Sequence, residues 1–311
     1  MIVDAPVLVI GRKGQLATDL VAVATDEHAP VIALGRPDFD LMDADAARRA
    51  LDRYRPGAVI NAAAYTAVDR AESEGEAAFS LNRDGAARLA AACAAAAIPF
   101  LHVSTDQVFD GSKAGAYVED DVTGPLCVYG QSKLAGEIAV LEANPSALVA
   151  RTSWVFGPSG DNFVTKVLGW ARASQNGAGQ NLRIVGDQRG CPTYSPDLAF
   201  CLLTLAQAMA VGGDNAPVGI LHLAGPEAMT RDEQARRILA GSAARRGPFA
   251  GVTPVPTRDF PTRDFPTPAT RPLNAELDTG RLKAVYGLQL QPFGEALAAT
   301  LDRLLGPVKI G

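Results

Sequence analysis

The sequence predicts an α/β protein with a doubly wound parallel sheet and a smaller C-terminal lobe. Short, continuous apolar runs alternate with alanine-rich segments of helical period through the first half of the chain. A glycine-containing turn directly follows the first of these runs. The chain has 311 residues, of which 48% are hydrophobic, so it can form about two domains or one enlarged domain with an added lobe.

Five apolar runs are expected to be strands of the sheet, at residues 6–11, 31–35, 58–64, 99–105 and 147–154. Their apolarity is continuous rather than alternating, which is typical of parallel strands buried on both faces. Helices are expected between them, at residues 15–25, 44–54, 76–97 and 130–142. This order is that of a βαβ chain, with helices covering both faces of the sheet.

The regular alternation of strands and helices becomes weaker after residue 154. We expect helices at residues 163–173, 196–209 and 292–305, a glycine-rich turn at 175–181, and a strand at 219–223 that returns to the sheet. The segment 249–273 is rich in proline and contains TRDFP twice, at 257–261 and 262–266, so we expect an extended loop without helix there. The first domain is therefore predicted at residues 1–156 with returning segments at about 192–224, and the smaller lobe mainly at 157–191 and 225–311.

Composition and charge exclude several classes of protein. The chain has 34 acidic and 29 basic residues, a net charge of −5, and its Lys and Arg are scattered, so we expect neither nucleic acid nor a membrane surface as partner. Four widely spaced cysteines and three histidines argue against a disulfide framework or a zinc site and favour a reducing compartment. No apolar run is long enough to span a membrane and the start lacks a signal-peptide pattern, so a cytoplasmic protein is expected.

The turn after the first expected strand reads GRKGQLA at residues 11–17 and opens the first helix. Backbone N–H groups at such a helix start can bind a pyrophosphate, and the small residues permit its close approach. At the first strand of a βαβ chain, this pattern predicts a Rossmann dinucleotide site, although a tight turn without a ligand has the same letters. The residues expected to bind the cofactor there are Gly11, Lys13, Gly14, Gln15 and Leu16.

The second expected strand ends at Arg36. An acidic residue at that place would bind a ribose 2′-hydroxyl, whereas an arginine can pair with a 2′-phosphate, so Arg36 favours NADPH over NADH. A solvated surface arginine is the alternative, and NADH stays open as a second cofactor. Asp40 would either contact the adenosine or cap the helix expected from about residue 44.

Tyr129 and Lys133 form a Y-x-x-x-K pair on an expected helix, so both side chains point to one side. A phenol is a weak acid at neutral pH, and the Lys133 ammonium is expected to lower the pKa of Tyr129. Thr105 ends the fourth expected strand and supplies a hydroxyl donor. These three residues predict a site that reduces a carbonyl group; a buried tyrosine beside a surface lysine is the structural alternative.

Several segments together resemble a known family. They are VIGRKGQLA, NAAAYTAVDRAE, LHVSTDQVFDG, PLCVYGQSKLAGE, ARTSWVFG, GDNF, DQRGCPTY and PTPATRPLNAELDT. The chain resembles the extended short-chain dehydrogenase/reductases and, more narrowly, the dTDP-4-dehydrorhamnose reductase family. The resemblance covers nearly the whole chain. It implies NADPH-dependent reduction of the C4 keto group of dTDP-4-dehydro-L-rhamnose, with the C-terminal lobe binding the substrate.

The resemblance also implies roles for individual residues. Gly14, Gln15 and Leu16 would bind the pyrophosphate. The other cofactor contacts would be Asp40 and Leu41 at the adenosine, and Ala63, Ala64, Tyr65 and Thr66 at the nicotinamide ribose. Tyr129 would donate the proton, Lys133 would bind the nicotinamide ribose, and Thr105 would hold the sugar oxygen. Asp106 and Trp154 would border the deoxysugar, although a tryptophan at a strand end is more often part of the core.

Departures from the family pattern leave other functions open. Gln107 and Cys127 stand where the family usually has Tyr and Asn, Cys191 replaces a smaller residue, and the second TRDFP lengthens a loop near the expected substrate. A dehydratase or epimerase of the same superfamily shares the cofactor signature, but a dehydratase needs an acid and a base after Thr105, and Gln107 cannot act as a base. A non-catalytic subunit of the methionine adenosyltransferase type is a third interpretation.

Metal and assembly are less constrained by the sequence. We find no ligand cluster of recognised spacing, so the sequence predicts no metal site, and a role for Mg²⁺ has no motif to support it. A homodimer is kept open as the oligomeric state.

Overall fold

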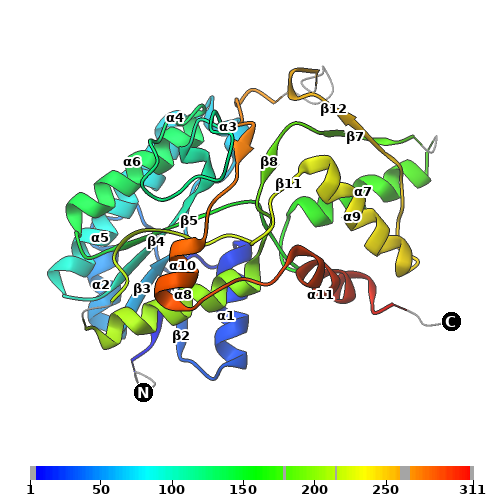
Figure 1. The fold of residues 1–311 in the computed structure, drawn as a ribbon. Helices are drawn as coiled ribbons and strands as arrows, with labels where there is room; N and C mark the ends of the chain where they lie inside the picture. Colours follow the sequence, from blue (N-terminus) through cyan, green and yellow to red (C-terminus); the bar gives the residue numbers. More distant parts are fainter. Residues whose placement is uncertain (1–4, 178–179, 214–215, 260–266, 309–311) are drawn as a thin grey trace.

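The computed structural model describes residues 5–177, 180–213, 216–259 and 267–308. Its centre is a six-stranded parallel sheet in the order β10-β5-β4-β3-β1-β2 (Figure 1). The strands are β1 Val7–Ile10, β2 Val31–Leu34, β3 Ala58–Asn61, β4 Phe100–Thr105, β5 Leu148–Thr152 and β10 Gly219–His222. The predicted fold class is confirmed, and the strand expected at 219–223 does return to the sheet beside β5.

Helices cover both faces of this sheet. On one face α1 (Gln15–Asp26) and α8 (Ser195–Val211) enclose a core that contains Val9, Ile60 and Leu101. On the other face α2 (Ala46–Tyr54), α5 (Ala86–Ala95) and α6 (Val128–Ala143) enclose a second core. Neighbouring residues of one strand thus belong to different cores, which explains why the strands are apolar throughout.

The single helix expected at residues 76–97 is three helical pieces. They are α4 (Gly75–Phe79), the π-helix η1 (Ser80–Gly85) and α5, preceded by the short α3 (Val68–Ala71). A π-turn adds a residue to the helix and rotates the side chains around it. Here the turn contains Asn82, whose buried side chain hydrogen-bonds to Tyr65 and Ser132, contacts that hydrophobic periodicity does not reveal.

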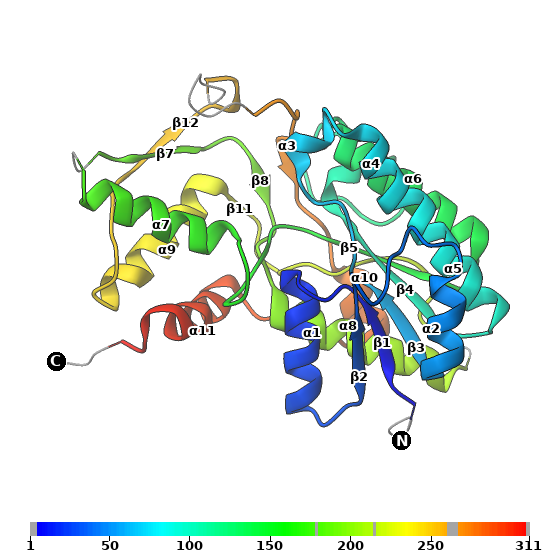
Figure 2. The same ribbon diagram turned by 180° about the vertical axis from the view of Figure 1, so that it is seen from behind.

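The second part of the chain forms a smaller group of helices and short strands beside the sheet (Figure 2). Its core lies between α7 (Phe163–Gln175), α9 (Arg231–Ala244) and α11 (Phe293–Leu305). Three small sheets accompany it. They pair β7 (Leu182–Val185) with β12 (Val252–Val255), β8 (Arg189–Gly190) with β11 (Met229–Thr230) and β13 (Asn274–Ala275), and β6 (Val155–Phe156) with β9 (Thr193–Tyr194).

Two helices of this part were not predicted. Helix α9 begins with a capping box in which Thr230 and Glu233 satisfy each other's backbone N–H groups, a signal that the letters TRDE contain. The other is α10 (Gly280–Tyr286), whose Leu282 packs into the core beneath the main sheet.

The expectation of an extended loop without helix at residues 249–273 is wrong in part. Strand β12 runs through Pro254 and pairs along one edge with β7, and a proline is tolerated in such an edge strand. A 3-10 helix, η3 (Thr257–Asp259), follows it. The end of the first TRDFP copy and the whole of the second lie outside the described residues. No helix of the described ranges is long and apolar enough to cross a membrane.

Candidate active site

The start of α1 offers free backbone donors at the carboxyl end of β1. Gly11 turns the chain with φ of +129°, and α1 begins after Gly14 with no side chain capping its N–H groups and no acid in its first turn. A Cβ at Gly14 would meet nothing within 4 Å, so the helix start is open to a ligand. The side-chain nitrogen Nε2 of Gln15 is buried without a hydrogen-bond partner in the described part of the chain. This arrangement can accept a pyrophosphate.

The end of β2 lies beside this turn, because β1 and β2 are paired from Val7 to Ile10. Arg36 is exposed there, and no ion pair to it occurs among the described residues. Asp40 accepts the backbone N–H of Met42, and α2 begins only at Ala46, so the expectation that Asp40 might cap this helix is wrong.

Leu41 is 7% exposed and packs against Gly85, where a Cβ would collide with it. The residue is therefore part of the core between β1 and the π-helix. Any contact that it makes with an adenosine would use its backbone or the edge of its side chain.

The loop after β3 carries Ala63, Ala64, Tyr65 and Thr66. Asn82 fixes this loop, because its side chain accepts the Tyr65 N–H at 2.8 Å and donates to the Tyr65 carbonyl at 3.1 Å. The same amide donates to Ser132 on α6 at 2.9 Å. Asn82 thus connects the loop to the helix of Tyr129 and Lys133. The sequence analysis missed it, and no spacing pattern marks it.

Tyr129 and Thr105 are brought together where α6 begins against the end of β4. Gly130 makes this possible, since a Cβ there would overlap the backbone oxygen of Gln107. Tyr129 is 8% exposed, and burial raises its pKa, whereas a hydrogen bond with Thr105 opposes the rise. The expected lowering of this pKa by Lys133 is absent in this structure, and the phenol stays protonated at neutral pH.

The Lys133 side chain reaches β4, an interior strand of the sheet. Its Nζ donates to the carbonyl of Val103 at 2.7 Å and lies 3.2 Å from Nε2 of His102. Burial lowers the pKa of Lys133 to about 8, although the carboxylate of Glu137 acts in the opposite direction. Glu137 itself is ion-paired with the buried Arg151 at 2.7 Å.

Asp106 lies next to Thr105 and is buried. The Ser153 hydroxyl donates to it at 2.6 Å and the Thr105 hydroxyl at 3.0 Å. Burial raises the pKa of Asp106, and these hydrogen bonds partly offset the rise. Asp106 therefore holds Thr105 in place and faces the positive charge of Arg231 at longer range.

Trp154 follows β5 in a left-handed conformation, with φ of +44°. The guanidinium of Arg231 lies 3.4 Å from the centre of its ring, a close cation–π contact. Gly190 lies against the same ring, and any Cβ at that position would collide with it. Trp154 is thus held at the border between the sheet and the smaller group of helices, not in the core as the structural alternative supposed.

A cavity of about 540 Å³ opens beside Trp154 and Arg231. Its lining includes the aromatic side chains of Trp154, Phe163 and Trp170 and the cationic side chains of Lys166, Arg231, Arg258 and Arg271. Burial lowers the pKa of Arg231 to about 9. Sequence reasoning found only Trp154 of this set. The other aromatic and cationic residues come from α7, α9 and the segment near η3, and no spacing joins them.

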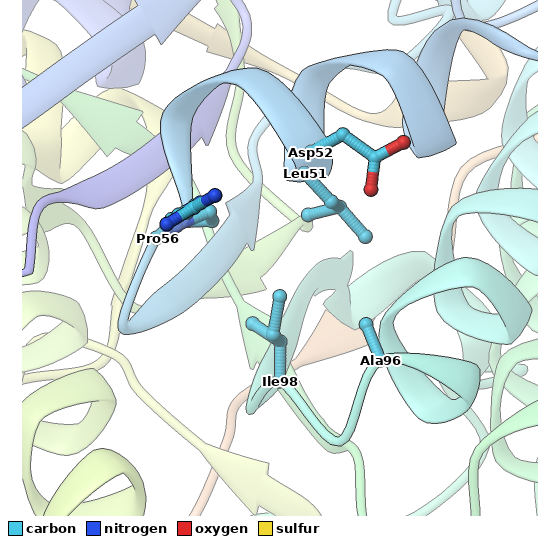
Figure 3. A pocket seen from close by; sticks show the side chains of 6 residues that line it. Leu51, Asp52, Pro56, Ala96 and Ile98 are labelled. Carbon is cyan, nitrogen blue, oxygen red and sulfur yellow. The ribbon is translucent and has the colours of Figure 1, made fainter.

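A separate hollow of about 470 Å³ lies at the opposite end of the sheet (Figure 3). It is formed by the end of α2 and the segment before β4, with Leu51, Asp52, Pro56 and Ile98 among its walls. It contains no residue expected to bind a ligand. Within the described ranges, no group of three or more His, Cys, Asp or Glu side chains is arranged to hold a metal ion.

Comparison with known proteins now identifies the family. The model of the RmlD substrate binding domain matches residues 5–305. A dTDP-4-dehydrorhamnose reductase of Sinorhizobium fredii is 38% identical over 297 residues, which cover 96% of this chain and 97% of the relative.

Solved structures agree with this match. The dTDP-4-dehydrorhamnose reductase of Clostridium acetobutylicum superimposes with a TM-score of 0.85 at 29% identity, covering 96% of this chain and 99% of that one. The reductase of Bacillus anthracis, in complex with NADP, has a TM-score of 0.83 at 28% identity and covers 95% and 98%. This chain belongs to the RmlD substrate binding domain family, and the three relatives named here are dTDP-4-dehydrorhamnose reductases.

Proposed function

We propose that this protein reduces the C4 keto group of dTDP-4-dehydro-L-rhamnose to give dTDP-L-rhamnose, the last step of dTDP-rhamnose biosynthesis, with NADPH as the reductant. The observation that carries the proposal is the meeting of Thr105 and Tyr129 in a protein that also has an open start of α1 and a cationic cavity beside Trp154. The start of α1 would take the dinucleotide, and the cavity would take the nucleotide sugar.

The residues at the α1 start suit a dinucleotide. Free N–H groups after Gly14 and the unpartnered amide of Gln15 can bind its pyrophosphate, and Arg36 is free to meet a 2′-phosphate. The loop from Ala63 to Thr66 and the amine of Lys133 would hold the nicotinamide ribose. When bound, the reduced nicotinamide supplies the hydride. NADH would bind without the contact to Arg36, and a requirement for Mg²⁺ has no support here.

Tyr129 and Thr105 would act on the sugar carbonyl. The Thr105 hydroxyl donates to Asp106 in this structure, so it would turn to the sugar oxygen when the sugar binds. Two hydroxyl donors at one oxygen would then stabilise the negative charge that develops as the carbonyl is reduced. Tyr129 then gives its proton to that oxygen. Its raised pKa suits this role, because the phenol carries its proton at neutral pH and the alkoxide is a much stronger base. Asp106 keeps the Thr105 hydroxyl oriented.

The cavity beside Trp154 suits a nucleoside diphosphate attached to a sugar. Arg231 and Lys166 can bind the negative charges of a diphosphate, and the aromatic rings can pack on a base or a sugar face. We therefore propose that residues 157–191 and 225–311 form mainly the substrate lobe, while residues 1–156 with about 192–224 bind the cofactor.

The location and assembly of the protein are also proposals. All four cysteines are free and buried, which supports a reducing compartment such as the cytoplasm. A homodimer is the assembly to test, by sedimentation of the purified protein.

The deciding experiment is an assay of NADPH oxidation by the purified protein with a set of nucleotide 4-keto-6-deoxysugars. Reduction of dTDP-4-dehydro-L-rhamnose to dTDP-L-rhamnose without any second protein is expected. Dehydration of dTDP-glucose instead would favour the dehydratase interpretation, and Gln107, whose amide accepts from Cys127, would have to be explained. Cofactor binding without turnover of any sugar would favour a regulatory subunit.

A further inference from the structure

Three buried polar side chains, those of Asn61, His102 and Lys133, form a hydrogen-bonded series that ends on α6. Asn61 and His102 are directly paired residues of the neighbouring strands β3 and β4, so their side chains lie on one face of the sheet. The Asn61 amide contacts Nδ1 of His102 at 3.1 Å, and Nε2 of His102 contacts Nζ of Lys133 at 3.2 Å. Each of the three residues is at most 1% exposed, so water does not compete for these contacts.

The direction of this series follows from its first member. The backbone N–H of Ala63 donates to Oδ1 of Asn61 at 3.2 Å, and a backbone N–H can only donate. The other end of the amide is therefore the NH₂ group, which donates to Nδ1 of His102. A neutral imidazole that accepts at Nδ1 carries its proton on Nε2. That proton points at the nitrogen of Lys133.

We propose that His102, oriented by Asn61, is a positioning residue that donates a hydrogen bond to the neutral amine of Lys133 in the cofactor-free protein. Lys133 then accepts from His102 with its lone pair and donates to the Val103 carbonyl. Its one remaining N–H is left for the nicotinamide ribose. Residues of the paired strands β3 and β4 thus fix the direction of the neutral amine.

The ionisable groups around Lys133 are consistent with this assignment. On its own helix, Glu137 attracts the ammonium form, but this carboxylate is shared with Arg151 on β5. On β4, His102 has its pKa lowered far below the usual value by burial and by Lys133, so it is neutral at pH 7. Tyr129 is protonated and neutral. Burial outweighs the attraction of Glu137, and a neutral amine at Lys133 becomes accessible from about pH 8.

The direct test is the tautomer of His102, read from the ¹⁵N shifts of the ring nitrogens in the cofactor-free protein above pH 8. We expect the Nε2–H tautomer, with the signal assigned by its loss in His102→Gln. His222 is an internal control, because its Nδ1 faces the carbonyl of Asp278 and should carry the proton. An Nδ1–H tautomer or a doubly protonated ring at His102 would overturn the proposal.

Asn61→Asp tests the direction of the series, because a carboxylate can only accept. It should move the His102 proton to Nδ1, turn Nε2 into an acceptor and raise the pKa of Lys133 by about one unit or more. The double variant Asn61→Asp with His102→Leu keeps the charge and breaks the series. If the double variant shows the whole rise in the pKa of Lys133, the effect is only electrostatic and the hydrogen bonds through His102 play no part. Should Asn61→Asp fail to fold, the tautomer measurement on the unmodified protein still decides.

A measurement of activity, which rests on the proposed reduction, distinguishes a positioning role of His102 from a role in packing alone. His102→Leu should lower kcat/KM for NADPH about 10- to 100-fold and move its alkaline limb, whereas His102→Gln, which keeps a polar group near Nε2, should recover part of the loss. Equal losses in the two variants with an unchanged pH profile would indicate packing alone. Failure of the reduction assay would leave the ¹⁵N and Lys133 titration results valid, so the two proposals can fail separately.

Discussion

Replacement of Arg231 by methionine should make the protein more stable and a poorer enzyme. The guanidinium lies over the Trp154 ring and donates to Gln234, and no carboxylate ion-paired with it occurs in the described part of the chain. These contacts only partly offset the cost of burying the charge, because the guanidinium loses water molecules in the cavity wall and gains no carboxylate partner. Methionine has a similar length and can pack on the same ring.

The structure gives the size of both effects. A pKa that falls from 12.5 to about 9 corresponds to about 5 kcal/mol against the charged form, and about half of that applies to a side chain that lines an open cavity. Loss of the cation–π contacts with Trp154 and Phe163 costs about 1–2 kcal/mol, so Arg231→Met should gain at most about 1 kcal/mol in the free energy of unfolding. A hydrogen bond from a charged donor to a diphosphate contributes about 1.5–3 kcal/mol, so KM for the keto-sugar should rise about 10- to 150-fold.

The assay combines urea unfolding with steady-state kinetics at pH 7. Arg237→Met is the matched control, because Arg237 also lies over an aromatic ring, that of Phe293, but pairs with Glu227 away from the cavity. It should leave KM unchanged and not increase stability. An Arg231→Met protein that is less stable than the unmodified protein and binds the keto-sugar as tightly would refute the reasoning, because Arg231 would then be a structural cation.

Four further outcomes follow from the site. Tyr129→Phe should lower kcat by more than Thr105→Val, which should cost roughly ten- to a thousandfold, because only Tyr129 also supplies the proton; equal losses in a kinetic comparison would contradict this order. Above the Lys133 pKa of about 8 the amine loses its charge, so kcat/KM for NADPH should fall about tenfold per pH unit, and a profile flat to pH 10 would exclude this role. Arg36→Ala should lower the NADPH to NADH ratio of kcat/KM, and an unchanged ratio would make Arg36 a surface residue. Arg151→Met removes the ion pair of the buried Glu137, so urea unfolding should register a loss of about 3–5 kcal/mol, and a loss under 1 kcal/mol would contradict a stabilising role for this pair.

Local patterns were sufficient to predict the main sheet but not the smaller lobe. Strands such as β1 and β4 are buried on both faces and flanked by helices, so their apolar runs are unambiguous. The smaller lobe joins two-residue strands such as β6 and β9 through contacts distant in sequence. Strand β12 was not predicted because it contains Pro254. A proline disrupts a strand that has two neighbours but is tolerated in a strand that has one.

The same distinction applies to the site. Tyr129 and Lys133 were predicted as site residues because one helix turn separates them, and Thr105 because it ends a strand. Asn82 and Arg231 were not found, since each acts through a partner on another element: Asn82 through Ser132, and Arg231 through Trp154. Sequence spacing identifies groups that share an element, whereas groups that converge from several elements require the fold.

Burial shifts the ionisable groups around Thr105 toward their neutral forms. It raises the pKa values of Tyr129 and Asp106 and lowers those of Lys133 and Arg231. For the two acids this favours the protonated forms, which suits a site that delivers a proton. For the two bases the cost of the charge is relieved by an anionic ligand, because opposite charges nearby favour the ionised form. Arg231 lines the cavity, so a phosphate-bearing ligand bound there would lower the cost of its charge. Both bases still carry their charge at pH 7, because their pKa values of about 8 and about 9 lie above that pH, so an anionic ligand would relieve a cost that the folded protein already bears.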